Sequence, residues 1–130
     1  MTIYITTDAV VISIRKILLI KRKKEPFKNF WALPGGFINY GEKAENACLR
    51  ELKEETSLTG EIRKLIGVYS DPKRDPRGHT ITIAYLIKNT KGKIKAKDDA
   101  KEINWFSIKN LPKLAFDHSN IVKDALQSIK

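Results

Sequence analysis

The most informative stretch of this chain is GFINYGE at residues 36–42, continued by RELKEETSL at residues 50–58. It has the pattern of a loop followed by a helix. Glu51, Glu54 and Glu55 are spaced i, i+3 and i+4, so the three carboxylates share one helical face, where like charges repel. A cation is the usual compensation, and carboxylate oxygens are the ligands that Mg²⁺, Mn²⁺ and Ca²⁺ prefer. The pattern therefore predicts a divalent metal site.

The remaining face of the same helix indicates how it packs. Ala44, Cys48 and Leu52 are apolar at i, i+4 and i+8, which is typical of a helix side turned to a core. The preceding segment, LPGG at residues 33–36, is expected to turn the backbone sharply into the helix, and glycine allows a carbonyl group to approach a ligand closely. The alternative interpretation is a solvated charged face. The apolar side and the glycines both weigh against it.

These residues resemble the Nudix box, which reads Gly, five residues, Glu, seven residues, then Arg-Glu-apolar-any-Glu-Glu-any-Gly-apolar. The one departure is Ser57, where the family usually has a glycine that ends the helix in a left-handed conformation. Its absence leaves open whether the helix ends there or at Gly60, and it leaves the metal face unaffected. The positions in register are Gly36, Glu42, Arg50, Glu51, Leu52, Glu54, Glu55 and Leu58.

The resemblance implies an α/β (α+β) fold, the Nudix α/β/α sandwich with a central mixed β-sheet, as one domain over residues 1–130. Hydrophobic periodicity agrees with that order of elements. Strands are expected at 6–14, 16–22, 30–33, 61–69, 79–87 and 102–106. Helices are expected at 41–56, with Glu42 in its first turn, and from Asp117 onward. The lysine-rich segment around residues 89–92 has the pattern of a hairpin.

The resemblance also implies an activity, since Nudix enzymes use a divalent metal to hydrolyse a nucleoside diphosphate linked to another moiety. Mg²⁺ is the expected ion, with Mn²⁺ as an alternative. By resemblance, Glu51 and Glu55 are the best direct ligands, Glu54 is next, and the Gly36 carbonyl is a backbone ligand. Arg50 is expected to orient these carboxylates. An ion pair of Arg50 with Glu42, which would fix the loop to the helix, is an equal and compatible interpretation.

The sequence does not decide which residue acts as the general base. Glu51 or Glu54 could serve, but some family members recruit a carboxylate from a distant loop. In this chain Asp98, Asp99 and Glu102 precede Trp105 and would supply such a group. Each is equally explained as a surface charge. That simpler interpretation is favoured for Asp98, whereas Asp99 and Glu102 remain candidates.

Substrate contacts are expected outside the box. The segment YSDPKRDPRGH at residues 69–79 is similar to a loop of ADP-ribose pyrophosphatases in this family. Asp75-Pro76 makes a rigid turn, and Arg74 and Arg77 offer planar forks for phosphate. Arg22 stands where family arginines meet the substrate. The simpler alternative for all of these is an ordinary surface loop with solvated charges.

Two further residues precede the last helix. Asp117 is accounted for as its N-cap. His118 as a base or a ribose contact is the less favoured interpretation. Trp31 is expected to pack in the core, as large aromatic residues usually do.

Composition sets the remaining bounds. The formal charge is +10, but the lysines are scattered without interleaved aromatic residues, so a solvated surface is favoured over nucleic-acid binding. The single cysteine, Cys48, forms no internal disulfide. We expect no secretory signal, no membrane span and a cytoplasmic location. A homodimer is compatible with the family resemblance.

The leading functional hypothesis is a Mg²⁺-dependent pyrophosphohydrolase that splits ADP-ribose into AMP and ribose 5-phosphate, with a small-molecule nucleotide as its partner. The second is a sanitising hydrolase of nucleoside triphosphates. The positive charge keeps an RNA-end hydrolase in consideration. A non-catalytic ADP-ribose sensor is disfavoured, because the chain ends one helix after the expected fold closes and every carboxylate of the box is present.

Overall fold

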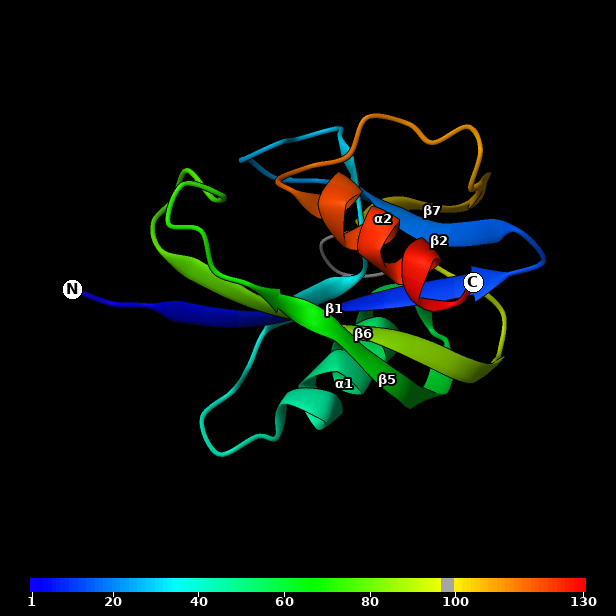
Figure 1. Cartoon of the computed structure of the whole chain (residues 1–130), viewed down its shortest axis with the longest axis horizontal. Coiled ribbons are helices and arrows are strands. Elements are labelled where there is room, and N and C mark those ends of the chain that lie inside the picture. The colour runs from blue at the N-terminus through cyan, green and yellow to red at the C-terminus, as the bar shows by residue number, and fades with distance from the viewer. Residues whose placement is uncertain (97–99) are drawn as a thin grey trace.

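The computed structural model describes residues 1–96 and 100–130 (Figure 1). Among these residues no helix combines the length and the apolar character that crossing a membrane requires. The elements are β1 (Tyr4–Ser13), β2 (Lys16–Arg22), β3 (Trp31–Ala32), β4 (Gly35–Phe37), α1 (Ala44–Thr56), β5 (Thr59–Tyr69), β6 (Thr80–Lys91), β7 (Ala100–Ser107) and α2 (His118–Ser128).

The strands form one mixed sheet. Its main path runs β3-β2-β1-β6-β5, with β4 paired to β1 and β7 paired to β2. β1 and β6 are parallel in the register Tyr4↔Thr80 to Val11↔Ile87, whereas β2 and β4 run antiparallel to β1. The centre of the sheet is therefore β1, whose neighbours come from both halves of the chain.

The two helices cover opposite faces of this sheet (Figure 1). Side chains alternate between faces along a strand, so neighbouring residues of β1 enter different cores. Ala9 and Val11 pack with Leu52 of α1, whereas Val10 between them packs with Ile121 of α2. The predicted α/β/α sandwich with a central mixed sheet is confirmed.

The glycines of residues 33–36 do not form the sharp turn expected from the sequence. Gly35–Phe37 is instead the short strand β4, hydrogen-bonded to β1. A Cβ atom at Gly35 would lie 2.1 Å from the carbonyl oxygen of Thr7 and 2.2 Å from Oδ1 of Asp8. Glycine is needed here because the two strands approach so closely.

Helix α1 begins three residues later than predicted. Lys43 is its N-cap residue, so Glu42 lies before the helix and not in its first turn. The Glu42 side chain is held from the loop instead, since its carboxylate accepts the backbone N–H of Asn39 at 3.1 Å and the guanidinium of Arg50. These contacts outweigh the helix-dipole preference on which the prediction depended.

The same helix ends at Thr56, so the alternative end at Gly60 is wrong. Ser57 is the C-cap residue with φ = 70°, in the left-handed conformation, and its N–H donates to the carbonyl of Lys53 at 2.9 Å. Gly60 is already part of β5. Serine thus takes the conformation that the family glycine usually supplies.

We expect Ser57→Gly to raise the free energy of unfolding by about 1 kcal/mol. The left-handed conformation costs an L-residue about 1–2 kcal/mol, and glycine removes that cost. This gain in the folded state exceeds the stabilisation of the unfolded chain by the extra entropy of glycine. The Ser57 hydroxyl is also buried with no hydrogen-bond partner among the described residues, so its removal is favourable. Urea unfolding followed by circular dichroism measures the change. A lower unfolding midpoint for the variant would contradict it.

The prediction of a lysine-rich hairpin around residues 89–92 is also wrong. Residues 89–91 continue β6, which is paired with β1 and β5, whereas β7 is paired with β2. The two strands that were expected to form the hairpin are therefore not neighbours. The local turn residues predicted a reversal, but the antiparallel pairing of β6 with β5 extends past them to Thr59↔Lys91.

Candidate active site

One cavity, of about 550 Å³, is lined by several separate segments of the chain. It receives side chains from β1, from the end of β2 and the residues that follow it, from α1, from the loop before β6 and from the start of α2. Such a volume suits a nucleotide-sized ligand. Its acidic side chains are Asp8, Glu25, Glu51, Glu54, Glu55 and Asp75, and its basic ones are Arg22, Lys23, Lys24, Arg74 and Arg77.

The acidic wall consists of Glu51, Glu54 and Glu55, and α1 places all three at the cavity, as the helical spacing predicts. Glu55 is buried, and its Oε1 accepts the N–H of Gly35 at 2.7 Å. Glu51 lies directly against Gly36, where a Cβ atom would come within 2.5 Å of the glutamate Cδ. A side chain at residue 36 would therefore displace the Glu51 carboxyl group from its place.

Arg50 connects the acidic wall to the loop before the helix. Its guanidinium donates to Glu42 at 2.7 Å, to Glu51 at 2.8 Å, to Glu54 at 3.2 Å and to the carbonyl of Phe37 at 3.1 Å. Both contacts weighed for this residue, with the carboxylates of the wall and with Glu42, are thus present together. Arg50 orients two of the three wall carboxylates from one side.

The electrostatics of these groups differ from one carboxylate to the next. The hydrogen bond from Arg50, followed by that from Asn39, holds the pKa of Glu42 below its usual value. Burial raises the pKa of Glu51, and although Arg50 opposes this effect, the negative charges of Glu54 and Glu42 add to it. At Glu51 the cost of burying the charge therefore outweighs the compensation that Arg50 supplies.

The donor set fits a hard divalent cation. Carboxylate oxygens and a backbone carbonyl are the ligands of Mg²⁺ and Mn²⁺, and Mg²⁺ usually keeps several waters and uses only one or two carboxylates. Within residues 1–96 and 100–130, no group of three or more Asp, Glu, His or Cys side chains is arranged so that it could hold a metal ion. The wall offers Glu51, Glu54, Glu55 and Gly36.

The basic wall consists of Arg22, Lys23, Lys24, Arg74 and Arg77. Nε of Arg22 donates to the carbonyl of Pro26 at 2.7 Å. Arg74 is nearly buried, with side-chain exposure of 4%, and Arg77 is 45% exposed. Phosphate groups are the anions that such planar forks recognise.

The loop that carries the last two arginines is fixed by Asp75. This buried carboxylate accepts the backbone N–H of Arg77 at 2.9 Å and two donors of the same guanidinium. Burial alone would raise the pKa of Asp75, but these bonds from Arg77 outweigh it and the pKa lies below its usual value. Pro76 is exposed in the turn and is not among the residues that line the cavity.

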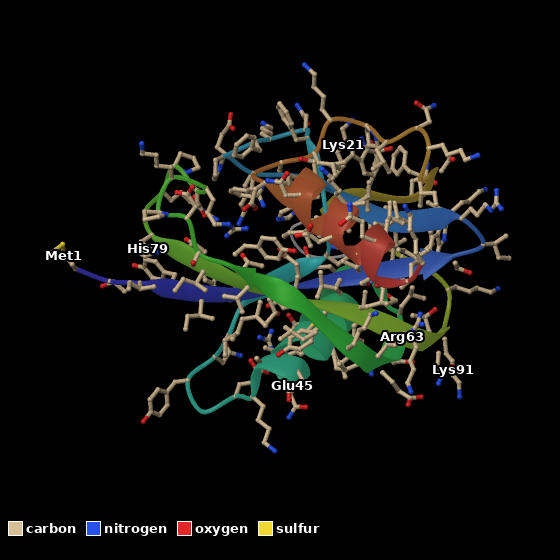
Figure 2. The ribbon with its side chains drawn as sticks, viewed as in Figure 1. Met1, Lys21, Glu45, Arg63, His79 and Lys91 are labelled. Atoms are coloured by element: carbon tan, nitrogen blue, oxygen red, sulfur yellow. The ribbon has the colours of Figure 1, made fainter. Side chains whose placement is uncertain are left out.

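Glu102, one of the carboxylates considered as a base, is not among the residues that line the cavity. Glu102 lies on β7, is 57% exposed on its side chain and pairs with Lys21 at 3.3 Å. Figure 2 shows Lys21 on the opposite side of the molecule from Glu45 of α1. Asp98 and Asp99 lie outside the described residues.

The N-cap explanation of Asp117 is incomplete. The residue does occupy the N-cap position of α2, but in the described structure its carboxylate binds Arg74 and not the helix N–H groups. Its Oδ1 and Oδ2 accept from the guanidinium at 2.6 and 2.9 Å. An ion pair between residues so distant in sequence overrides the local capping preference.

Several cavity residues were not predicted from the sequence, and Asp8 and Phe116 are two of them. Asp8 is a buried acid directly before the apolar run of residues 9–12, and that anomaly is the sequence signal that could have indicated it. Phe116 looks like an ordinary aromatic residue in the sequence. Its backbone φ of 52° is seen only in the structure.

Comparisons with known proteins agree with this arrangement. Residues 4–125 match the model of the NUDIX domain family. The chain is 52% identical over 123 residues to an ADP-ribose pyrophosphatase of Methanocaldococcus jannaschii, a match that covers 95% of this chain and 73% of that protein. It is 33% identical to the ADPR responsive transcriptional repressor NtrR of Acinetobacter baylyi, over 92% of this chain and 52% of the repressor.

Two solved structures place the fold in the same group. The NUDIX domain of Shewanella oneidensis NrtR, crystallised with ADP ribose, superposes with a TM-score of 0.91 at 27% identity, covering 100% of this chain and 90% of that one. A bifunctional NMN adenylyltransferase/ADP ribose pyrophosphatase of Francisella tularensis, with AMP and a Mn ion, gives a TM-score of 0.89 at 34% identity. That match covers 99% of this chain and 42% of the other. With the family model spanning nearly its whole length, the chain belongs to the Nudix family and is a Nudix pyrophosphohydrolase.

Proposed function

We propose that this Nudix enzyme hydrolyses ADP-ribose to AMP and ribose 5-phosphate with Mg²⁺ at the acidic wall. The observation that carries the proposal is the meeting of the acidic and basic walls in one cavity. A diphosphate matches both, since its oxygens bind divalent cations and arginine forks alike. The similarity to an ADP-ribose pyrophosphatase, at 52% identity, supports the choice of diphosphate compound.

The acidic wall would hold the cation. Glu51 and Glu55, together with the Gly36 carbonyl, are the proposed ligands, and the close approach of Gly36 to the Glu51 carboxyl group supports that pairing. A bound divalent ion neutralises phosphate charge and lowers the pKa of coordinated water. Mn²⁺ would serve as well, because the donor set is the same.

Glu54 is the proposed general base. Its side chain is 48% exposed, the most accessible of the three wall carboxylates by burial class, and Arg50 orients it at 3.2 Å. From there it can take a proton from a water molecule that attacks a phosphorus atom of the diphosphate. Arg22 and Arg77, as forks at the same cavity, would hold the non-bridging oxygens while the bond to the leaving phosphate breaks.

The test is direct incubation of the purified protein with ADP-ribose and Mg²⁺, with products separated by ion-exchange chromatography. We expect AMP and ribose 5-phosphate in equal amounts, no reaction in EDTA, and recovery when Mg²⁺ is added in excess. Nucleoside triphosphates, tested in parallel, should react more slowly. Absence of AMP, or faster release of pyrophosphate from triphosphates, would overturn the choice of substrate.

A further inference from the structure

Three consecutive residues, Phe116, Asp117 and His118, connect the cavity wall to the start of α2. Each contacts a cavity residue from a different part of the chain, although the three are neighbours in sequence. The segment is anchored to the sheet just before it, where Ala115 N–H donates to the carbonyl of Trp31 at 2.8 Å. It is therefore a fixed point from which side chains reach the cavity.

Phe116 contacts two arginines of the basic wall. Its ring centroid lies 5.0 Å from Cζ of Arg22 and 5.5 Å from Cζ of Arg77, and both distances fall within the range of a cation–π contact. The two guanidiniums come from segments more than fifty positions apart in the chain. One aromatic ring therefore contacts two arginines that line the cavity, of which Arg77 is also paired with Asp75 at 2.8 Å and lies 5.8 Å from the ring of Phe37.

The backbone of Phe116 is strained in a way that points to function. Its φ of 52° is unusual for a bulky residue, which the left-handed region disfavours. Such outliers persist where the surroundings enforce them, and they cluster at ligand sites. Phe116 lines the cavity, and its ring also packs on Phe27, with the two ring centroids 4.8 Å apart.

Asp117 fixes the third arginine. The two oxygens of its carboxylate bind the Arg74 guanidinium in a bidentate pair, and Thr82 Oγ1 accepts a further bond from Arg74 at 2.7 Å. Arg74 is nearly buried, so its orientation at the cavity is set by these partners. A bidentate pair defines the plane of the guanidinium as well as its position.

His118 contacts two further residues that line the cavity, Leu33 and Asp8. Its Nδ1 accepts the N–H of Leu33 at 3.0 Å, so in the neutral ring the proton is on Nε2. That atom lies 3.2 Å from Oδ2 of Asp8, a buried acid that also lines the cavity. The histidine thereby connects α2 to β1 and to the residues between β3 and β4.

We infer that residues 116–118 are a positioning segment for substrate binding, in which Phe116 sets Arg22 and Arg77 as a two-armed clamp for the diphosphate. The inference rests on the proposed function for the identity of the substrate, but the clamp itself is defined by anion binding. Phe116 acts through the arginines and takes no part in the bond-breaking step. Asp117 and His118 fix the position of the neighbouring part of the cavity wall relative to this clamp.

The experiment measures pyrophosphate binding in metal-free buffer by calorimetry, with wild type, Phe116→Leu and Phe116→Tyr. Leucine keeps apolar bulk but lacks the ring faces, so we expect about a tenfold weaker Kd. Tyrosine keeps the ring and should restore the wild-type value. Phe106→Leu is the matched control, because Phe106 packs on Trp31 and is not among the residues that line the cavity.

A second arm uses ADP-ribose turnover with Mg²⁺. We expect Phe116→Leu to raise KM about tenfold with kcat within about twofold, because the ring acts on binding. In combination with Arg22→Lys, the loss of pyrophosphate affinity should be smaller than the sum of the single losses. Phe116→Met replaces the leucine variant if that protein does not fold.

The outcomes separate the inference from the proposed function. Equal pyrophosphate affinity of wild type and Phe116→Leu, no pyrophosphate binding by wild type, or a fall in kcat at unchanged KM would each overturn the clamp. Wild type that binds pyrophosphate in a Phe116-dependent manner but forms no AMP from ADP-ribose would overturn the substrate alone.

Discussion

Glu51→Gln is expected to lower kcat for ADP-ribose hydrolysis by about a thousandfold, roughly 4 kcal/mol of transition-state stabilisation. The Glu51 carboxyl group lies at the cavity against Gly36 and accepts from Arg50 at 2.8 Å. Glutamine keeps its size and a hydrogen-bond acceptor for Arg50, but it removes the negative charge that a divalent ion requires. The loss should therefore fall on catalysis and metal binding.

The free energy of unfolding of Glu51→Gln should stay close to that of wild type although its activity falls. Burial raises the pKa of Glu51, which means that the folded protein already disfavours the charged form. A neutral side chain of the same shape is therefore expected to fold as well as wild type, within about 1 kcal/mol. Thermal unfolding in EDTA measures this directly, and Mn²⁺ titration followed by electron paramagnetic resonance measures the weaker metal binding.

The matched control is Glu61→Gln, the same chemical change on the exposed surface of β5. Glu61 contacts Asn89 at 3.1 Å and does not line the cavity. Its variant should keep wild-type kcat and metal affinity. If Glu51→Gln retained more than a tenth of wild-type activity, the carboxylate would not be a metal ligand and the assignment of the acidic wall would fail.

The parts of the site that sequence predicted are those whose geometry is local. Glu51, Glu54 and Glu55 reach one cavity because a helix repeats every 3.6 residues, so their spacing alone places them together. The apolar face of α1 is local in the same sense, and the buried Cys48 confirms its expected side. The contacts of Arg50 are also local, because its carboxylate partners lie on the same helix and on the short loop before it.

The parts that sequence did not predict depend on contacts between distant residues. His118 accepts from Leu33, and Asp117 binds Arg74. Nothing within a few residues of either position specifies such a partner, so Asp117 was explained by its helix cap alone. Local capping chemistry is a weak preference, and a bidentate ion pair with a nearly buried arginine is stronger.

The lysine-rich hairpin failed for a related reason. Residues 89–92 have turn-forming character, and local pattern alone predicts a reversal there. The structure instead continues β6 to Lys91 because its pairing with β5 extends that far. Pairing energy summed over many residues overrides the preference of one turn.

Gly36→Ala is the second variant with a large expected effect, about a hundredfold loss of kcat. A Cβ atom at residue 36 would lie 2.5 Å from Cδ of Glu51 and 2.6 and 2.7 Å from its two oxygens, closer than van der Waals contact allows. These atoms are the far end of a flexible side chain, so the carboxyl group can swing aside. The methyl group therefore displaces Glu51 at little cost to folding.

Gly67→Ala serves as the control for adding a methyl group to a strand glycine. A Cβ atom there would meet only Tyr69, at 3.4 Å, and Gly67 does not line the cavity, so its kcat should match wild type.

The decisive measurement is the double variant of Gly36→Ala with Glu51→Gln. Suppose that the methyl group acts only by moving the Glu51 carboxylate. When Glu51→Gln has already removed that charge, Gly36→Ala should cause no further loss of activity. Its kcat should equal that of Glu51→Gln alone. A hundredfold further loss would mean that residue 36 acts independently, through its own carbonyl or the path of β4, and the contact with Glu51 would not be the reason for glycine at this position.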